Sequence, residues 1–583
     1  MKLRTCFTAA LLISVAILPL SVSGTLAQDA PAAFKPHVMR GKDPALELSV
    51  LGQYRSGIYR KSAAEIVNFD PASKRAFVIN AANREVDVLD LSDPAAPKKA
   101  MTINVSDIGA DANSVAVSKG LVAIAIEAKV KSDPGFVAFY DTAGKRLSVV
   151  QVGALPDAVT FSPDGRWVLT ANEGEPSNDY AVDPEGSVSI VDLSVGAANV
   201  TQAQVRTADF KAYIGKEDDL RKQGIRIFGP KANAAQDFEP EWVEVSPDSR
   251  TAYVSLQENN AIAVIDIASA RVTAVHALGF KDWSANGAWS GKGFDASRSG
   301  PVNIRHWPVF GMFNPDTIRL YQTGGEIYLV TANEGDARDY ENDDWFSEEI
   351  ELRQLKLDPK AFPNAAELQS TAQLGSLVVT TNMGISNGCN ASPTTAEAQA
   401  AGFKTVRAYV IDKCVYDRIF AFGARSMAIF KVKPDGLELV FDTGSQFEEI
   451  TLAAQPAFFN ADHRDRDQQL RRRSPNKGPE PEGIALGEID GRTYAFVGLE
   501  RVGGIMVYDI TEPTKSAFVT YINNRDFTLP LDAKAQVTTD LGPEGLHFVP
   551  AAQSPDPKGR PVLIVGNEVS GTTTIFAIDR LKK

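Results

Sequence analysis

A repeated hairpin pattern constrains the fold of this chain more than any other feature. Residues 155–177 read LPDAVTFSPDGRWVLTANEGEPS, two alternating apolar and polar runs around a Pro-Asp-Gly turn. Pro and Gly favour tight reversals, and a period of two is typical of half-buried strands. Related hairpins begin at Glu239, Asn314, Glu480 and Gly542. Each unit supplies three or four strands in about 40 residues, the spacing of a propeller blade.

These units predict an all-β chain, a seven-bladed β-propeller with long loop insertions. The 583 residues are 44% hydrophobic, so a large core can form, and a repeat architecture absorbs a length that would otherwise be divided among several domains. We expect the first residues to complete the last blade, because propellers pair both chain ends and so remove exposed edges. The interruptions are expected to be loops rather than domains, at about 204–237, 279–309 and 341–422.

The N-terminus has the pattern of an export signal. Lys2 and Arg4 precede a short apolar run, and small or short residues end at Ala27, where we expect cleavage. Residues 1–27 are thus a predicted signal peptide, and 28–583 the single propeller domain of a periplasmic or secreted protein. The apolar run is too short for a permanent span, so no membrane anchor is expected.

The net charge and cysteine content of the chain after this cleavage indicate which classes of partner it can bind. Losing the two cations Lys2 and Arg4 takes the formal net charge from -13 to -15, which argues against nucleic acid and for solubility or cation binding. A solvated acidic surface is the simpler explanation of the bulk charge. Two cysteines remain, Cys389 and Cys414, and in an exported chain they predict a disulfide, with two free thiols as the alternative.

Acids recur in pairs along the hairpins. From the acid before the first strand to the acid after the second, the offset is 16, 17, 18 and 18 residues in four hairpins. A chain that runs down and back returns to the same edge, so both acids of each blade should lie on one face near the axis. The first two hairpins are weaker, with Glu65 facing Asn83 and Asn113 facing Glu127. The candidate metal ligands are Asp157, Glu173, Glu241, Glu258, Asp316, Glu334, Glu482, Glu500, Glu544 and Glu568.

Such a set of carboxylates would repel strongly unless cations lie among them. Calcium prefers carboxylate and carbonyl oxygens, and the loops ANEGEP and ANEGDA offer both, so a divalent metal, calcium, is the predicted cofactor. The alternative is turn chemistry, because Asp and Asn favour turns and their side chains would then face water.

Several arginines are also expected at the predicted acidic edge. Arg338, Arg425 and Arg501 fall at or beside it, and His463 lies in a charged loop before an Arg-rich run. A guanidinium beside a metal can hold a phosphate or carboxylate, so these four are candidate anion-binding residues. The alternatives are arginines that merely pair with the acids and a solvated histidine. No nucleophile motif accompanies them.

Longer strings carry a family resemblance. LPDAVTFSPDG, YLVTANEGDARDY, GARSMAIF, GPEPEGIALG and LGPEGLHF resemble the choice-of-anchor I domain family, whose animal relatives include mesenchyme-specific cell surface glycoproteins. The resemblance implies a propeller, export and, in animals, a role in calcium biomineralisation; some bacterial relatives carry an alkaline phosphatase label. Where relatives often read RSDDKG, this chain reads RRRSPNKG, which predicts a rim more favourable to anions.

Two functions remain open at this point. The first is a calcium-binding module of binding or matrix type, whose partner is a small anionic ligand or an extracellular polymer. The second is a metal-dependent phosphatase or phosphodiesterase, in which a metal-bound water attacks and Arg338, Arg425 or Arg501 stabilises the phosphoryl oxygens. Fold alone does not choose between them, because propellers host both.

Overall fold

Antiparallel sheets made of consecutive strands account for most of this chain. The computed structural model describes residues 34–340, 346–464, 468–531 and 539–581, so the predicted signal peptide lies outside the described residues. Strands make up 41% and helices 11%, which makes the protein all-β. The chain divides into the units Met1–Lys35 and Pro36–Lys583, and every element described below belongs to the second.

Seven sheets share one up-and-down antiparallel order. Four of them are continuous in sequence: β3 (Val67–Asp70), β4 (Arg75–Asn80), β5 (Glu85–Asp90) and β6 (Lys98–Asn104); β7 (Ala112–Ser118), β8 (Leu121–Ile126), β9 (Pro134–Asp141) and β10 (Arg146–Ala154); β11 (Pro156–Phe161), β12 (Trp167–Asn172), β13 (Ser187–Asp192) and β14 (Val205–Asp209); β15 (Pro240–Val245), β16 (Thr251–Leu256), β17 (Ala261–Asp266) and β18 (Arg271–Ala277).

The other three take strands from distant parts of the sequence: β21 (Ile318–Thr323), β22 (Glu326–Ala332), β28 (Met427–Lys433) and β29 (Gly436–Asp442); β30 (Pro481–Ile489), β31 (Arg492–Leu499), β32 (Ile505–Asp509) and β33 (Ala517–Asn523), with β1 (His37–Arg40) beside β33; β34 (Pro543–Val549), β35 (Val562–Asn567), β36 (Thr572–Arg580) and β2 (Leu46–Arg55). Helix α6 (Gln446–Ala454) contacts β1.

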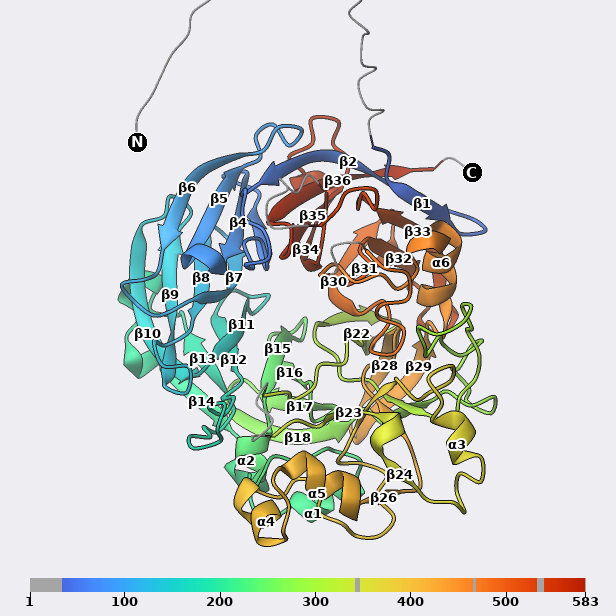
Figure 1. Ribbon diagram of the computed structural model, residues 1–583. Coiled ribbons are helices and arrows are strands. Elements are labelled where there is room, and N and C mark those ends of the chain that lie inside the picture. The colour runs from blue at the N-terminus through green and yellow to red at the C-terminus, as the bar shows by residue number, and fades with distance from the viewer. Residues whose placement is uncertain (1–33, 341–345, 465–467, 532–538, 582–583) are drawn as a thin grey trace, which may run out of the picture. The chain divides into compact units, whose positions relative to one another are not determined.

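The first strand of each sheet is the innermost, and these strands form a closed ring. Each contacts the next in the order β3, β7, β11, β15, β21, β30, β34 and back to β3. Figure 1 looks down this ring, with the sheets arranged around its centre. The arrangement is propeller-like, and residues on the inner strands from distant parts of the sequence therefore meet at one axis.

Both chain ends close the ring in one sheet. Strand β2 pairs antiparallel with β36, with a register that runs from Leu46 opposite Arg580 to Arg55 opposite Thr572. This pairing confirms the expectation that residues near the N-terminus complete the last sheet, although the first strand, β1, instead pairs with β33 of the preceding sheet. Apolar side chains fill the spaces between neighbouring sheets. For example, Phe496 of β31 and Phe576 of β36 lie in the same apolar core.

Local turn chemistry explains the hairpins. In the β11–β12 turn, Ser162 Oγ donates to an Asp164 carboxylate oxygen at 2.6 Å and accepts from the Trp167 N–H at 2.9 Å. Gly165 adopts a φ of +79°, which a side chain would disfavour. The same chemistry closes β15–β16, where Ser246 Oγ donates to Asp248 at 2.6 Å. The Ser-Pro-Asp pattern therefore fixes where the chain reverses.

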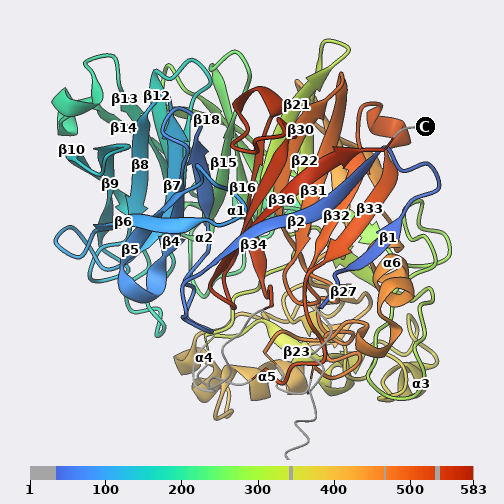
Figure 2. The ribbon, with the colours of Figure 1, turned by 90° about the horizontal axis from the view of Figure 1, so that it is seen from above.

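Two of the expected loop insertions form a folded layer instead. Residues 279–309 and the described part of 341–422 share an apolar core that includes Trp283, Leu352 and Tyr416. Their sheets contain β19 (Phe280–Asp282), β20 (Phe310–Met312), β27 (Phe420–Ala421), β25 (Val378–Thr380) and β23 (Glu349–Glu351), then β24 (Lys356–Leu357) with β26 (Val415–Tyr416). The helices are α3 (Ala365–Leu368), α4 (Thr395–Ala400) and α5 (Val406–Lys413). Figure 2 shows α3, α4, α5 and β23 gathered at one end of the ring.

A disulfide joins Cys389 to Cys414 within this layer, with the two Cα atoms 5.1 Å apart, which confirms the predicted pairing. The remaining insertion, expected at 204–237, begins later than predicted, because β14 within it is the outer strand of its sheet. The rest carries α1 (Glu217–Lys222) and α2 (Ala234–Asp237), which pack against the β11–β18 core.

Candidate functional site

A cavity of about 820 Å³ lies where the innermost strands converge. Acids contributed by all seven sheets line it, together with Lys61, Arg464 and Arg501. The lining carboxylates are Glu65, Asp111, Glu127, Asp157, Glu241, Asp316, Glu334, Asp336, Glu482, Glu500, Glu544 and Glu568. Eight of the ten predicted ligands are in this set, and the two that are absent are Glu173 and Glu258.

Each sheet presents two positions toward the axis. One lies at or just before the start of the inner strand, and the other follows the end of the next strand. From β3 round to β34, the first position holds Glu65, Asn113, Asp157, Glu241, Asp316, Glu482 and Glu544. The second position holds Ala81, Glu127, Glu173, Gln257, Glu334, Glu500 and Glu568.

A β-bulge accompanies the first position in five sheets. Pro156 pairs with Asn172 and Val159 with Thr170, so three steps along β11 match two along β12. The extra residue is therefore Asp157 or Ala158. Bulges bend a strand locally and change the direction of a side chain, so this irregularity accounts for acids that leave the usual alternation and reach the axis.

Glycines after two of these acids allow the inner strands to approach closely. A Cβ on Gly483 would lie 1.8 Å from the Glu544 backbone oxygen, and a Cβ on Gly545 would lie 2.5 Å from the Glu65 oxygen. Only glycine fits at such distances. The Pro-Glu-Gly strings therefore both supply an acid and bring neighbouring acidic strands together.

The nearly constant spacing between paired acids led to a wrong residue in two sheets. Gln257, not Glu258, directly follows β16, as Glu173 directly follows β12. The Gln257 amide lines the cavity and donates to Glu334 Oε2 at 2.8 Å. Glu258 lies one residue farther, is 8% exposed and is not part of the cavity wall. In the first sheet the residue opposite Glu65 is Ala81, which takes the position expected for Asn83.

Burial raises the pKa of many acids at the axis. Burial raises the pKa of Asp157 to about 7; the negative charge of Glu175 adds to this shift, and the positive charge of Lys131 opposes it. Burial and neighbouring acids raise that of Glu65 to about 8. The same causes place the pKa values of further acids well above the ordinary range: those of Glu241, Asp316, Glu482 and Glu544 in the cavity wall, and that of Glu173 beside it. These groups therefore bind protons near neutral pH and would release them to a cation.

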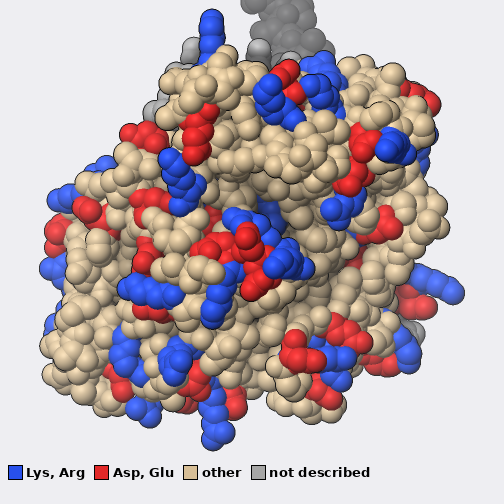
Figure 3. All heavy atoms as spheres, turned by 90° about the horizontal axis from the view of Figure 1, so that it is seen from below, with Lys and Arg blue, Asp and Glu red and all other residues tan. Residues whose placement is uncertain are grey.

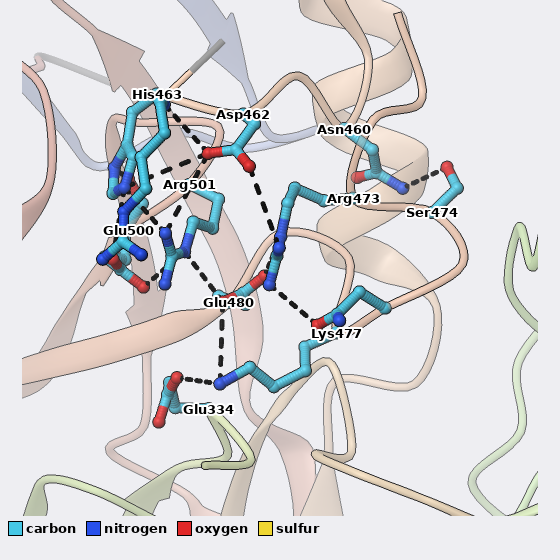
Figure 4. A network of polar contacts seen from close by, with 12 residues as sticks. Glu334, Asn460, Asp462, His463, Arg473, Ser474, Lys477, Glu480, Glu500 and Arg501 are labelled. Atoms are coloured by element: carbon cyan, nitrogen blue, oxygen red, sulfur yellow. Dashed lines mark hydrogen bonds and ion pairs between the residues drawn. The ribbon is translucent and has the colours of Figure 1, made fainter. Parts of the chain in front are cut away.

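The chain's own cations neutralise one side of the cavity, as Figure 4 shows. Lys477 Nζ contacts Glu334 Oε1, lies 3.3 Å from Asp336 Oδ1 and lies 3.7 Å from Glu480 Oε2. The side chain of Lys477 is only 7% exposed. Its ammonium occupies the position that a free cation would take among these three carboxylates.

Glu480 is the most strongly compensated acid of this network. Its carboxylate lies 2.6 Å from Arg473 Nε and 2.9 Å from Arg501 Nε. Burial alone would raise its pKa, but Arg473, Arg501 and Lys477 together lower it to about 2. Glu480 is thus ionised at all physiological pH values, in contrast to the acids of the opposite wall.

His463 and Arg501, two predicted anion-binding residues, contact each other. Arg501 donates to His463 Nε2 at 2.8 Å and lies 2.9 Å from Glu500 Oε2. Burial and the nearby arginines hold the pKa of His463 well below its usual value, so the ring is neutral and accepts from Arg501. His463 is fully buried, not solvated in a loop.

The other two predicted arginines lie away from the cavity wall. Arg338 is buried against Asp237 and Glu239, at 2.6 and 3.0 Å. Arg425 is buried against Glu448 at 2.6 Å. Both guanidinium groups are committed to structural ion pairs, because sequence adjacency to an acid does not determine which way an arginine points.

Most of the cations in the basic RRRSPNKG run also form ion pairs within the protein. Arg471 forms a buried pair with Asp295, while Arg473 and Lys477 face the acids of Figure 4. The expected anion-friendly rim therefore consists, at these three residues, of counter-charges for the chain's own carboxylates. Sequence reasoning missed the roles of Lys477 and Glu480; the available signal was the Glu-Pro-Glu string, whose first acid also pairs with arginine at Glu239.

Four groups of side chains could each hold a cation, with ligand atoms within 4.8 Å of one another. They are Asp157–Glu173–Glu241, Glu65–Glu544–Glu568, His463–Glu500–Glu568 and Glu334–Glu480–Glu500. The last is occupied by Lys477 and Arg501. In the first two groups, no lysine or arginine of the described chain lies within 4.0 Å of a carboxylate oxygen. His463 lies within 4.8 Å of Glu568, with which it forms the third group.

The outer surface offers no comparable concentration of charge on the face shown in Figure 3. Lysines and arginines lie among aspartates and glutamates there, without a field of one sign. Among the described residues, no helix has the length and apolar character needed to cross a membrane.

Fold and site together define a propeller-like, all-β protein with an acidic axial cavity. The chain belongs to the choice-of-anchor I domain family, whose model matches residues 65–513. Gigasin-3a of Magallana gigas is 29% identical over 171 residues, which are 28% of this chain and 58% of that protein. The mesenchyme-specific cell surface glycoprotein of Strongylocentrotus purpuratus is 26% identical over 252 residues, 38% of this chain and 29% of that protein. The chain thus spans less than two thirds of either relative.

Solved structures show weaker likenesses. Hydrazine synthase of Kuenenia stuttgartiensis matches with a TM-score of 0.42 and 13% identity, over 91% of this chain and 99% of that one. The periplasmic gluconolactonase of Pseudomonas aeruginosa matches with a TM-score of 0.40 and 13% identity, over 91% and 92%. At such scores neither likeness carries an argument about this chain.

Proposed function

We propose that this protein is an extracellular or periplasmic binding module, a seven-bladed propeller whose axial cavity binds a divalent cation, calcium. Family membership and a relative described as a cell surface glycoprotein support the location. The seven sheets and the closed ring of their inner strands support the blade count. The proposal assigns cation binding to the group Asp157, Glu173 and Glu241 and to the group Glu65, Glu544 and Glu568.

One observation carries this proposal: most of the acids around the cavity have no lysine or arginine in ion-pair contact. Among the described residues, no lysine or arginine lies within 4.0 Å of the carboxylates of Glu65, Asp157, Glu173, Glu241, Asp316, Glu482, Glu544 and Glu568. One Glu482 oxygen is buried and has no hydrogen-bond partner in the described structure. Like charges in such a site raise each other's pKa and favour a cation, and oxygen donors from several directions suit calcium, which takes six to eight ligands.

The alternative, a phosphoester hydrolase that uses Arg338, Arg425 or Arg501, is not favoured. Phosphoryl transfer needs positive groups that are free to contact the developing charge. Arg338 and Arg425 lie in buried ion pairs outside the cavity wall, and Arg501 is engaged by Glu480 and Glu500. The residues predicted to stabilise phosphoryl oxygens are therefore committed elsewhere.

Calorimetric titration with calcium, together with thermal unfolding in calcium or chelator, tests the proposal. We expect binding in the wild type and a gain of about 2.7 kcal/mol at a hundred times the dissociation constant. The variant Asp157→Asn/Glu241→Gln should lose most of this response. Its metal-free form should unfold no lower than the wild type, because no ion pair within 4.0 Å is lost and repulsion among ionised acids is relieved.

The control is Asp218→Asn/Glu512→Gln, which alters two exposed acids that pair with Arg221 and Lys515 at the surface. This control should keep the full calcium response. A wild type that ignores calcium, or a loss of response that is equal in both double variants, would contradict the proposed cation site.

A further inference from the structure

The acidic cavity has a basic edge whose cations form no close ion pair with the acids, although the charge of Arg464 partly offsets the rise that burial causes in the pKa of Glu568. Lys61 and Arg464 line the cavity together with the acids. A second cavity of about 290 Å³ adjoins it and is lined by Arg60, Ser62, Arg464, Glu568 and Val569. Since Ser62, Arg464 and Glu568 line both, the two cavities meet at this edge, and Arg60, Lys61 and Arg464, here called the basic edge, border that meeting point.

The three cations of the basic edge are exposed and lack carboxylate partners. Each is solvent-accessible, and none has a carboxylate oxygen within 4.0 Å among the described residues. They differ in this respect from Lys477, Arg473 and Arg501 of the same cavity region, which are all committed to ion pairs. The Glu568 carboxylate lies between the two cavities and accepts from Ser62 Oγ at 3.3 Å.

Backbone contacts hold this edge in place. The Arg60 N–H donates to the Val569 oxygen at 2.8 Å, and the Ala81 N–H donates to the Ser62 oxygen at 2.9 Å. The Arg60 guanidinium donates to the Arg464 backbone oxygen, which brings two distant segments together. Arg60 and Ser62 both have left-handed φ values, +56° and +53°. Non-glycine residues adopt this conformation at a cost, and such strain is concentrated at ligand-binding sites.

We propose that the basic edge binds an oxyanion group of the ligand, a phosphate, sulfate or carboxylate, next to the cation held by the acids. Guanidinium groups present paired donors that match two oxygens of such an anion, and a lysine adds a mobile point charge. The cavity would then hold a cation and an anion side by side, as a ligand that coordinates calcium through its own oxyanion requires. This inference rests on the proposed cation site for its partner ion, but the anion-binding residues are a separate set.

Thermodynamic linkage provides the test. If the anion and calcium bind side by side, each must raise the affinity for the other by the same factor. Methylphosphonate is the main probe, because it cannot be hydrolysed as an ester, with sulfate, acetate and chloride compared at equal ionic strength. We expect methylphosphonate to tighten calcium binding at least about fivefold over chloride in the wild type. The most effective of the three oxyanions identifies the ligand's anionic group.

The variant Arg60→Gln/Arg464→Gln should lose this enhancement while its calcium affinity in chloride stays the same or rises, because two positive charges near the cation disappear. Lys61→Gln should lose part of it. The control is Arg580→Gln, which removes an exposed guanidinium paired with Asp490; it should behave as the wild type. A normal melting transition in chloride shows that each variant is folded.

The failure of this inference is distinguishable from that of the proposed function. Calcium binding without any oxyanion effect, or an effect that the double variant retains, would overturn the basic edge and leave the cation site intact. If calcium does not bind at all, but methylphosphonate binds alone and the double variant loses it, the cation site fails and the basic edge stands.

Discussion

At the scale of single residues, the cavity is divided by charge. The cavity acids Glu65, Glu127, Asp157, Glu241 and Glu544 have no lysine or arginine within 4.0 Å in the described structure. In contrast, Asp111 lies 3.6 Å from Arg84, and Glu334, Glu480 and Glu500 have Lys477 and Arg501. Burial and nearby acids raise the pKa of Glu334 to about 7 even though Lys477 opposes the shift. The lysine therefore supplies a counter-charge inside one carboxylate group, where, under the proposed function, a free cation would otherwise bind.

Replacing this lysine should convert its site into an additional cation site. Lys477→Gln leaves buried carboxylates without a counter-charge, which typically costs about 3–5 kcal/mol of stability. We expect a loss of this order in chelator near pH 8, largely restored by calcium, and one more bound calcium per chain. Denaturant unfolding measures the stability, and equilibrium dialysis with metal analysis measures the stoichiometry.

The matched control is Lys515→Gln, whose exposed ammonium pairs with Glu512 at 2.7 Å. Such surface pairs contribute about 0–1 kcal/mol, so neither stability nor metal count should change appreciably. If Lys477→Gln is as stable as the wild type in chelator and binds no further calcium, the ammonium is not the occupant of a cation site.

At the scale of elements, hairpins were predictable and their partners were not. Ser-Pro-Asp turns and alternating runs fix β11–β12 and β15–β16 from local sequence alone. The residue opposite Glu241 was misassigned, because an offset counted along the chain does not locate strand ends and so took Glu258 in place of Gln257. Lys477 reaches Glu334 across 143 residues, and no local signal predicts such a contact.

The inserted layer illustrates the same limit. Taken separately, residues 279–309 and 341–422 look like irregular loops, because their strands are two or three residues long. Only together do they supply enough apolar side chains, such as Trp283, Leu374 and Val379, for a core of their own. Cooperation between two separated insertions is a long-range property, which explains why the sequence predicted the disulfide but not the layer.

Removal of the disulfide should therefore act locally. The pair Cys389→Ala/Cys414→Ala opens a loop whose ends are 25 residues apart, for which the chain-entropy model gives about 3 kcal/mol. We expect faster amide hydrogen exchange in α4, α5 and β26, with protection in β7–β18 unchanged. Mass spectrometry without reductant should show the wild type two hydrogens lighter than its reduced form. Uniform loss of protection throughout the ring would instead mean that the layer and the sheets unfold as one unit.

At the scale of the whole molecule, the ring concentrates protonatable groups at its axis, and this makes stability depend on pH. The pKa is raised to about 7 in Asp157 and Glu334 and to about 8 in Glu65 and Glu258, with burial as the first cause in each. A carboxyl whose pKa is raised by folding binds its proton more tightly in the folded state. Its contribution is fully present below its unfolded pKa and is lost as pH rises through the folded value.

Metal-free protein should therefore lose thermal stability between about pH 6.5 and 8.5, and calcium should stabilise it most at the upper end, where the acids are ionised. Buried His547, whose pKa burial and Arg319 lower to about 4, acts only below this window, since its unfolded pKa is near 6.5. Glu480, already ionised in this window, does not change the pH dependence of stability.

Melting temperatures across this window, with chelator and with calcium, give both slopes. In Asp157→Asn/Glu241→Gln the chelator slope should be shallower. A flat chelator curve in the wild type would show that the axial acids do not titrate in this range, and the charge argument for cation binding would fail with it.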